Sequence, residues 1–537
     1  MIAVSAVVAL CLAVGASRAT AAGSASPTGS ASPASITPPS PETGKTVLHI
    51  GWTTDVDSMN PFVGYAAQAY RVYSLNYDML LTYNASNLQP GPGLATSWSH
   101  SADGKTWIFK LRQGVKWQDG EAFTSRDVVF TFNYIIKNDL SAYTSYTKGI
   151  TSVVALDDYT VKFTCQVPKA TMLQMWVPIL PQHIWSHISP QDAGNKFQNL
   201  PPIIGTGPFQ VTAWKRGSYV IMRANPDYWG GRPKVDQIYF ETYTNGDTMA
   251  SDLRAGLLQY ATVTPALYQS FKSAPGVTAA LSTHLAYDQL AFNCYTGPSD
   301  GNPVLLDPAF RSALAWAIDT KTIASIAYNG AAVPATGILT SDFYPKSSDY
   351  HWQPTPDQAY RYDPAKADAL LTAAGYPLKN GVRVDKQGKP IKLRLWAFTD
   401  YPELPVDGKL ITGYLRKLGL QITFQTMDPS AGMDGIYATK NGKLRPNYDM
   451  FVWGWGGDID PSFMLAGLTT AQIGDWSDSG WSNAQYDRLY SQQNAALDVA
   501  KRVDLVHQMQ AIIYKQAPYI ALVYPQGREV YDTQHWT

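Results

Sequence analysis

The sequence predicts an α/β fold, and three observations lead to it. Strand-like segments recur along the chain, helix signals fall between them, and no internal repeat is present. A chain of 537 residues with 45% hydrophobic content is also long enough for two or three domains, each with its own core. We therefore expect more than one α/β domain.

The N-terminus carries signals for secretion. An apolar run over residues 2–16 has about the length of a signal-peptide core, and Ala19-Thr20-Ala21 follows it as a cleavage pattern. We expect a signal peptide over 1–22 and a disordered tether, rich in Ser, Ala, Pro, Thr and Gly, over 23–44. The usual positive charge before such a run is missing, which leaves open a start upstream of Met1.

An ordered series of strand, turn and helix signals occupies residues 77–136. In 105–112, every second residue is apolar, which is the period of a half-buried strand, and Asp103-Gly104 before it is a hairpin-type turn. Thr124 then precedes a helix over 126–137 with an apolar face. Such a helix belongs in a core, so the segment identifies a fold and carries no chemistry.

The rest of the chain continues the alternation of strands and helices. Asp307-Pro308 and Asp363-Pro364 each open a helix with an N-cap residue and a proline at the first helical position, the first helix reaching about Tyr328. Residues 483–515 have helical periodicity, interpreted as two helices broken near Asp498. The strand candidates are 46–52, 160–167, 219–224, 237–242, 392–398, 421–427, 448–455 and 519–524.

Charge and cysteine content exclude several classes of protein. The 42 basic and 42 acidic residues give a net charge of +0 without a basic run, which argues against nucleic acid or an anionic membrane surface as a partner. Three cysteines exclude a disulfide scaffold and a cysteine-based zinc site. We expect Cys165 and Cys294 to be buried thiols, with a bridge between them as the alternative. Cys11 leaves a lipid anchor open, but Leu10 stands where that processing needs a small residue, so we expect simple secretion.

Several of these segments together carry a family resemblance. Residues 205–240 contain GTGPF and NPDYWGGRP, residues 370–376 read LLTAAGY, and residues 448–461 read YDMFVWGWGGDIDP. With 77–136 and 292–328 they resemble, in the expected order, the family 5 extracellular solute-binding proteins, which are oligopeptide- and dipeptide-binding receptors of bacterial ABC importers. Relatives usually continue further at the C-terminus, which leaves an additional segment open.

The resemblance implies a bilobed clamshell of the periplasmic-binding-protein type II class, with an extra small domain. In such a fold the chain crosses between the lobes twice, and the ligand is enclosed at the lobe interface. Lobe one is then expected over 45–78, 206–283 and 517–537, the small domain over 79–205 and lobe two over 284–516.

The resemblance also implies ligand contacts in the first half of the chain. Tyr65, Ala66 and Ala67 stand where relatives pair with the backbone of a peptide ligand; the alternative is an ordinary surface loop. Tyr143, or Tyr146 in its place, follows the small-domain helix where relatives reach over the ligand; the alternative is an exposed loop tyrosine.

A second cleft segment is implied near residue 455. Trp453, Gly454 and Trp455 match the strand that hydrogen-bonds to peptide in relatives, and Asp458 matches the carboxylate that receives the ligand's α-ammonium group. An ammonium in a dry cleft must be paired, and tryptophan walls bury ligand side chains without fixing their identity. The alternative is that Asp458 caps the turn before Asp460-Pro461. This loop is one residue shorter than in several peptide receptors, which leaves oligosaccharides, nickel chelates and haem open as ligands.

No motif predicts catalysis, a cofactor or a metal site. His183 and His187 have the spacing of a helical zinc pair but lack the adjacent glutamate, and neither a nucleophile elbow nor a P-loop is present. A secreted glycoside hydrolase with Asp458 and Asp460 as its acids is the rival class. However, carboxylates two residues apart on an extended chain point to opposite faces. A scaffold protein that has lost transport is a third alternative.

The sequence therefore predicts a non-catalytic, monomeric receptor in the periplasm or at the outer face of the cytoplasmic membrane. It captures a peptide-like ligand and delivers it to an ABC permease and ATPase complex. Contact with the membrane is expected only through that complex or a lipid anchor. Closure of the lobes on the ligand produces the shape that the permease recognises.

Overall fold

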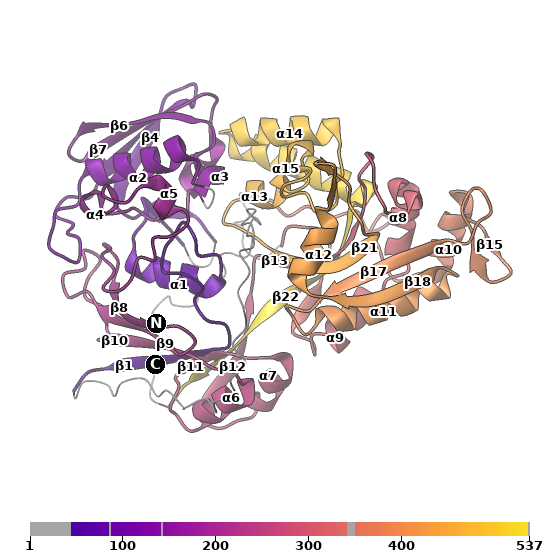
Figure 1. Ribbon diagram of the computed structural model, residues 1–537, viewed down its shortest axis with the longest axis horizontal. Coiled ribbons are helices and arrows are strands. Elements are labelled where there is room, and N and C mark those ends of the chain that lie inside the picture. Colours follow the sequence, from indigo (N-terminus) through magenta and orange to yellow (C-terminus); the bar gives the residue numbers. More distant parts are fainter. Residues whose placement is uncertain (1–43, 85–86, 141–142, 341–348, 535–537) are drawn as a thin grey trace.

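The computed structural model describes residues 44–84, 87–140, 143–340 and 349–534. The expected signal peptide and residues 23–43 of the expected tether lie outside these ranges. The described elements alternate between strands and helices, which confirms the α/β class. They form three groups (Figure 1), which we call lobe 1, the small domain and lobe 2. The residue boundaries that the sequence suggested for these groups stay predictions.

Lobe 1 is one end of a sheet that has 12 strands within the described ranges. Its elements are β1 (Val47–Trp52), β8 (Phe209–Lys215), β9 (Tyr219–Ala224), β10 (Gln237–Thr242), β11 (Tyr260–Thr262), β12 (Val277–Thr283), α1 (Ala67–Asn76), α6 (Gly246–Arg254) and α7 (Pro265–Phe271). Strand β1 pairs in parallel with β10 and β11, and antiparallel pairs lead from β10 through β9 to β8. Strand β1 is therefore an inner strand, as its apolar sequence VLHIGW favours.

The small domain carries a separate antiparallel sheet in the order β4, β5, β7, β6. Its elements are β2 (Leu81–Tyr83), β3 (Pro90–Pro92), β4 (Ala95–His100), β5 (Thr106–Leu111), β6 (Ile150–Asp157), β7 (Thr160–Cys165), α2 (Ser125–Asn138), α3 (Thr144–Thr147), the 3-10 helix η2 (Ala170–Gln174), α4 (Gln182–Trp185) and α5 (Pro190–Ala193). The expected strand over 105–112 is β5, and the expected helix is α2. The Thr124 hydroxyl accepts from the Arg126 backbone N–H, and Asp127 Oδ2 accepts from the Thr124 N–H at 2.9 Å. Buried side chains of the small domain and of lobe 1 form one apolar cluster, so the two pack as a single body.

Lobe 2 forms the other end of the large sheet. Its elements are β13 (Ala286–Phe292), β14 (Ala332–Pro334), β15 (Leu378–Lys379), β16 (Val382–Arg383), β17 (Lys392–Phe398), β18 (Gln421–Met427), β19 (Thr439–Lys440), β20 (Lys443–Leu444), β21 (Met450–Gly456), η3 (Pro303–Leu306), η5 (Thr470–Gln472), α8 (Pro308–Ala315), α9 (Thr320–Ile326), α10 (Pro364–Ala373), α11 (Leu404–Lys417), α12 (Pro429–Ile436), α13 (Pro461–Ala466), α14 (Ala484–Ala495) and α15 (Val499–Gln516). The single helix expected from Pro308 to about Tyr328 is wrong. It is interrupted because Asp319 caps a new helix, accepting from the Thr322 N–H at 3.1 Å.

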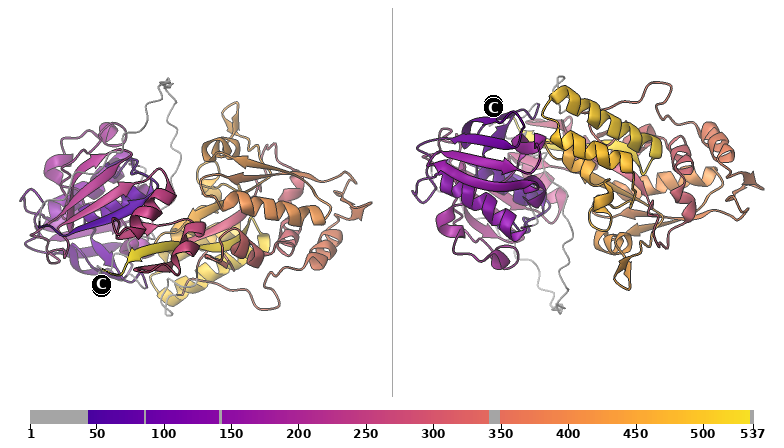
Figure 2. Two further views of the ribbon diagram at one scale, coloured as in Figure 1. Left: turned by 90° about the horizontal axis from the view of Figure 1, so that it is seen from below. Right: turned by 90° about the horizontal axis from the view of Figure 1, so that it is seen from above.

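The last strand, β22 (Tyr519–Asp532), joins the two lobes. Its first part pairs with β13 and β14, and its second part, from Gln526, pairs with β12 and β11 (Figure 1, Figure 2). The chain also crosses between lobes at residues 284–285, which connect β12 to β13. The sequence suggested a crossing near Ala517 and a strand ending at Tyr524. The strand is longer than expected, and its pairing favours a crossing between Pro525 and Gln526.

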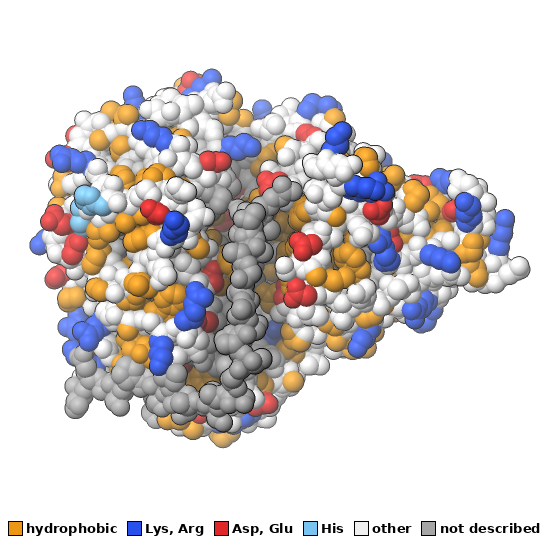
Figure 3. Space-filling model, in the orientation of Figure 1, with side chains coloured by type: hydrophobic (Ala, Val, Ile, Leu, Met, Phe, Trp, Pro, Cys, Tyr) orange, Lys and Arg blue, Asp and Glu red, His pale blue; other side chains and the backbone are white. Residues whose placement is uncertain are grey.

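The distribution of surface charge and the state of the two described cysteines agree with what the sequence composition suggested. Figure 3 shows basic and acidic side chains interspersed on the face in view, both over lobe 1 with the small domain and over lobe 2. Cys165 and Cys294 are both buried and unbonded, as expected from the sequence. No helix in the part of the chain that the structure describes is long and apolar enough to cross a membrane.

Candidate functional site

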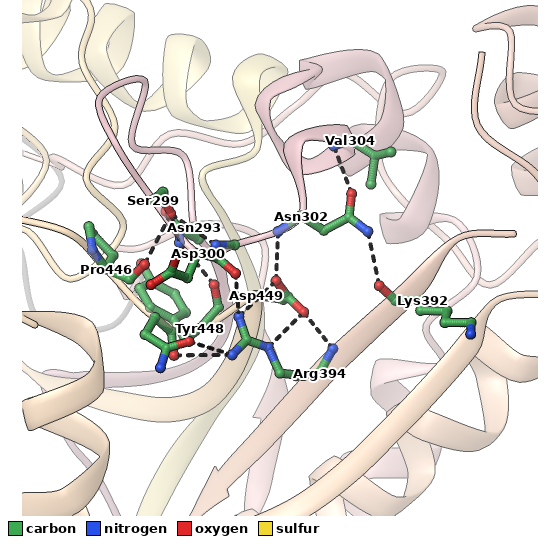
Figure 4. A network of polar contacts seen from close by, with 12 residues as sticks. Asn293, Ser299, Asp300, Asn302, Val304, Lys392, Arg394, Pro446, Tyr448 and Asp449 are labelled. Atoms are coloured by element: carbon green, nitrogen blue, oxygen red, sulfur yellow. Dashed lines mark hydrogen bonds and ion pairs between the residues drawn. The ribbon is translucent and has the colours of Figure 1, made fainter. Parts of the chain in front are cut away.

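Strand β21 lies inside the lobe 2 sheet and leads into the second cleft segment. It pairs in parallel with β17 and antiparallel with β13. At its start, the Asp449 carboxylate accepts from the Arg394 backbone N–H at 2.7 Å and from its Nε at 3.1 Å, and also from the Asn302 N–H at 2.7 Å (Figure 4). These bonds fix one end of the strand. Residues 453–458 at the other end are therefore presented from a rigid support.

The two tryptophans of β21 share a face of the strand but differ in exposure. Trp453 is half-buried, and its Nε1 donates to Asp400 Oδ2 at 3.0 Å. Trp455 is 8% exposed, and its Nε1 donates to Asp478 Oδ2, also at 3.0 Å. Their ring centroids are 6.0 Å apart. Trp453 therefore offers an accessible apolar wall, whereas Trp455 is held mostly in the core.

Two glycines of this segment are needed by neighbouring groups of the protein itself. A Cβ at Gly454 would collide with the Asp288 carboxylate, and one at Gly457 would lie 2.8 Å from the Leu285 carbonyl oxygen. The Gly457 N–H donates to that same carbonyl. Leu285 belongs to the connection between β12 and β13. Residues 453–458 are therefore hydrogen-bonded directly to one of the two segments that link the lobes. Hydrogen bonding of Gly454 to the backbone of a peptide ligand stays a prediction.

Asp458 is an enclosed carboxylate just past β21. It is 6% exposed, its Oδ1 accepts from the Ile459 N–H at 2.6 Å, and its Oδ2 accepts from the Tyr146 hydroxyl at 2.5 Å. Its pKa is raised to about 7, chiefly by burial; the two hydrogen bonds oppose the shift, and the Asp460 carboxylate adds to it. Within the described ranges, no lysine or arginine forms an ion pair with Asp458.

Asp460, two residues further on, has a different role. Its two carboxylate oxygens each lie 2.7 Å from a nitrogen of the Arg502 guanidinium, and Oδ1 caps α13 by accepting from the Ser462 N–H at 2.8 Å. Burial acts to raise the pKa of Asp460, but the Arg502 guanidinium holds it below its ordinary value. A carboxylate fully engaged in a buried ion pair is unavailable as a glycosidase acid, so the hydrolase alternative loses its support.

The structure brings Tyr146 to Asp458 and buries Tyr143 beside Tyr146, with 6.5 Å between the two ring centroids; a ligand contact of Tyr143 stays a prediction. The Tyr143 side chain is 1% exposed and packs edge-on against Phe62, with ring centroids 5.8 Å apart. Tyr146, in α3 of the small domain, reaches lobe 2 through its hydroxyl. The sequence named both tyrosines, but spacing alone could not show which one faces lobe 2.

Residues 65–67 lie where the loop after β1 turns into α1. Tyr65 is 53% exposed, and Ala67 is the first residue of α1. Asp57 Oδ2 accepts from the Tyr65 N–H at 2.7 Å, and Asp57 Oδ1 accepts from the Ala66 N–H at 3.1 Å. These two N–H groups are thus already bonded within the loop. Pairing of the segment with a ligand backbone stays a prediction, and sequence reasoning missed Asp57.

A buried pair of carboxyl groups beneath β21 was also missed. The Tyr328 hydroxyl is in close contact with Asp288 Oδ2 and lies 2.9 Å from Asp407 Oδ2, and all three side chains are buried. A phenol donates only one proton, so at least one of the carboxyl groups must be protonated to supply the second bond. Burial is the main cause that raises the pKa of Asp288 to about 7 and the pKa of Asp407 above its ordinary range. These residues share no motif, so only the fold brings them together.

Metal binding finds no support in the described ranges, where no group of three His, Cys, Asp or Glu side chains could hold an ion. His183, which the sequence did not assign to a zinc site with His187, has its Nε2 2.8 Å from Asp119 Oδ2.

Comparisons with known proteins agree with one another. A sequence profile of the family described as "Bacterial extracellular solute-binding proteins, family 5 Middle" matches residues 89–475. The dipeptide-binding protein of Escherichia coli (strain K12) is 26% identical over 496 residues, 87% of each chain. The glutathione-binding protein GsiB of Salmonella paratyphi A is 29% identical over 447 residues, 80% of each chain. NikZ from Campylobacter jejuni, solved in complex with Ni(L-His), shares the fold with a TM-score of 0.75 at 24% identity, covering 91% of this chain and 94% of that chain.

Proposed function

Because the chain belongs to the bacterial extracellular solute-binding proteins of family 5, which are non-catalytic receptors of ABC transporters, we propose that it captures a peptide-like ligand with a free amino group. The ligand is enclosed between lobe 1 and lobe 2 and delivered to a permease and ATPase complex. The family is extracellular or periplasmic, so capture takes place outside the cytoplasm. The receptor acts as a monomer.

One observation supports the choice of a ligand amino group. Asp458 is enclosed at the end of a fixed strand, it is approached from the small domain by Tyr146, and no cation of the described chain pairs with it. An ionised carboxylate in a dry site is costly unless a cation compensates it. A ligand ammonium beside Tyr146 supplies that cation and ionises Asp458.

The proposed closure uses the two crossings. Lobe 1, comprising residues 45–78, 206–283 and the second part of β22, moves with the small domain as one body, and lobe 2 moves as the other. The shared apolar cluster of lobe 1 and the small domain supports this division. The β22 pairing and residues 284–285 supply the hinge.

A metal chelate is the second candidate ligand. The Campylobacter jejuni protein of similar fold was solved with Ni(L-His), and a chelate brings its own metal ligands, so it needs no metal centre in the protein. It can also carry an amino or imidazole group toward Asp458.

The test combines identification and titration. Mass spectrometry of small molecules released from the secreted protein is expected to show peptides, and titration calorimetry with the dipeptide Ala-Ala and with glutathione is expected to give one site per chain for at least one of them. Binding of Ni(L-His) without binding of either peptide would replace the peptide proposal with the chelate. Steady hydrolysis of a bound peptide would contradict a receptor.

A further inference from the structure

Leu497 belongs to lobe 2 by sequence but packs on the small domain. It lies between α14 and α15 and joins the apolar cluster whose other described members come from residues 48–260. Figure 2, seen from above, shows α14 and α15 in yellow beside the purple strands of the small domain. Leu497 is therefore an apolar side chain of lobe 2 that packs on the opposite body.

Gly104 makes room for this side chain. It lies in the turn between β4 and β5 with a φ of 64°, and its N–H donates to the Ser101 carbonyl at 2.8 Å. A Cβ at this position would collide with Leu497 Cδ1. The Gly104 carbonyl accepts from Trp107 Nε1 at 3.2 Å, which holds the turn in place. The glycine thus serves the turn and also the seat for Leu497.

An open cleft adjoins the contact around Leu497. It borders a cleft of about 530 Å³ whose walls come from both bodies, including Trp98, His100 and Leu173 from the small domain and Tyr350, Ala496 and Val499 from lobe 2. The open cleft limits the area packed around Leu497, although η2 of the small domain also lies close to α14. Such a contact can separate without exposing a large core.

The contact between Leu497 and Gly104 lies far from the proposed hinge, in the region where opening and closing move the two bodies the most. In Figure 1, α14 approaches the small domain at the upper end of the molecule, whereas β22 crosses between the lobes near the lower end. Rotation about a hinge displaces distant groups the most, so opening would separate Leu497 from Gly104 early.

We propose that Leu497 seated against Gly104 is a latch, which stabilises the closed arrangement of the small domain and lobe 2 without touching the ligand. This inference rests on the hinged closure proposed above. A latch lowers the free energy that a ligand must supply for closure, so it strengthens the binding of every ligand by the same factor.

Leu497→Ala is the first test, with Leu370→Ala as its control. Leu370 lies on α10 with 38% of its surface exposed and makes no part of the latch. In X-ray scattering of the ligand-free secreted protein, Leu497→Ala is expected to increase the radius of gyration, whereas the control leaves it unchanged. An unchanged radius for Leu497→Ala would overturn the latch.

Binding supplies a second readout. For Ala-Ala and glutathione, Leu497→Ala is expected to weaken affinity by about tenfold for each peptide that binds, since the truncation removes part of one buried leucine contact. A loss confined to one ligand would overturn the proposal, because it would place Leu497 against that ligand. If neither peptide binds the wild type, the peptide proposal fails, and the scattering result still decides whether the latch exists.

Gly104→Ala tests the seat separately. The added methyl group is expected to unseat Leu497 and to increase the radius as Leu497→Ala does. In the double variant, which lacks both the clash and the contact, the second substitution should add nothing to the radius. Additive increases would show that the two residues act independently and would overturn the latch. Thermal unfolding of each variant separates this effect from a loss of stability of the turn.

Discussion

Asp458 has opposite consequences for binding and for stability. Its pKa is about 7 in the folded protein, mainly because it is buried, whereas an aspartate in an unfolded chain titrates near its ordinary value. Between these values the folded state binds the extra proton. The resulting stabilisation is complete below the ordinary pKa and is lost as the pH rises through about 7. Above that pH, the ionised carboxylate is ready for a ligand cation but costs stability.

We predict that Asp458→Asn weakens ligands with a free amino group. The change keeps the shape but leaves the ligand ammonium unpaired, which typically costs about 2–5 kcal/mol. Titration calorimetry with Ala-Ala and N-acetyl-Ala-Ala measures the coupling. The acetylated peptide should bind the wild type poorly and lose little more on mutation. Equal losses for both peptides would leave Asp458 as a turn cap only.

The same variant should be more stable than the wild type at high pH. At pH 8, Asp458→Asn removes a buried charge, and we expect the free energy of unfolding to rise by about 1–3 kcal/mol, with almost no change at pH 4. Urea unfolding at the two pH values measures this. Asp460→Asn is the contrasting control, since it leaves the Arg502 guanidinium buried and unpaired and should destabilise by about 3–5 kcal/mol at pH 8. A destabilised Asp458→Asn protein at pH 8 would contradict the assignment.

Affinity should also depend on pH. Because the ligand ammonium requires the ionised carboxylate, affinity is expected to rise with pH up to about 7 and then level off. Calorimetry in two buffers with different ionisation enthalpies should show proton release on binding near pH 6. The Asp458→Asn variant should show neither effect, and a pH-independent wild type would count against Asp458 as the ligand's partner.

At the scale of elements, helix α11 offers a matched pair of glycines. Gly408 is buried, and a Cβ there would lie 2.9 Å from the Ala397 Cβ and would also collide with the Phe424 ring, whereas nothing lies within 4 Å of a Cβ at exposed Gly413. The two positions therefore differ in packing and share the same helix.

We predict opposite effects of alanine at these two positions. Gly413→Ala should stabilise by about 0.5–1 kcal/mol through helix propensity, and Gly408→Ala should destabilise by about 1–3 kcal/mol through overpacking. Thermal and urea unfolding measure both. Similar effects of the two substitutions would show that α11 does not pack on the sheet as described.

The elements that the sequence predicted correctly are those with local signals. The caps at Asp307 and Asp363 and the break at Asp498 each begin a helix because the side chain bonds to nearby backbone N–H groups. Strand β22 was predicted too short because Pro525-Gln526-Gly527 resembles a turn. In the structure, a Cβ at Gly527 would collide with the side chains of Ser282 on β12 and His284 at the crossing. This restriction on residue 527 comes from side chains at the end of β12 and in the connection that follows it, so the sequence around residue 527 does not reveal it.

In the candidate site, too, some residues could be predicted from one continuous segment and others could not. Asp458 and Trp453 could be proposed because a strand, glycines and a carboxylate follow one another in sequence. The hydrogen bond from Tyr146 to Asp458 and the carboxyl pair around Tyr328 depend on contacts between distant segments, and the Asp57 bonds to residues 65–66 depend on how the loop folds back. Sequence patterns along one segment cannot supply such contacts.

At the scale of the whole molecule, several contacts between described side chains join the two bodies in addition to the pairing of β22. Three of them are the hydrogen bond from Tyr146 to Asp458, the packing of Leu497 against Gly104, and an ion pair of 3.0 Å between Arg528 in the second part of β22 and Glu403 at the start of α11. The first lies at the proposed ligand site, so occupancy of the cleft and closure of the bodies are coupled.

We predict that ligand binding compacts the protein. X-ray scattering with saturating Ala-Ala or glutathione, whichever binds, should give a smaller radius of gyration than the ligand-free protein, because contacts from both lobes hold the ligand only when they are closed. Asp458→Asn at the same ligand concentration should remain at the larger radius. A saturated wild type without compaction would contradict the clamshell mechanism.

The place of β22 in the chain has a consequence for how the protein is made. Among the described strands it comes last in sequence order, but it is an inner strand of the sheet, with β13 on one side and β11 on the other. During synthesis, both halves of the sheet wait with an unpaired inner edge until residues 519–532 have emerged, and neither lobe can complete its fold before then.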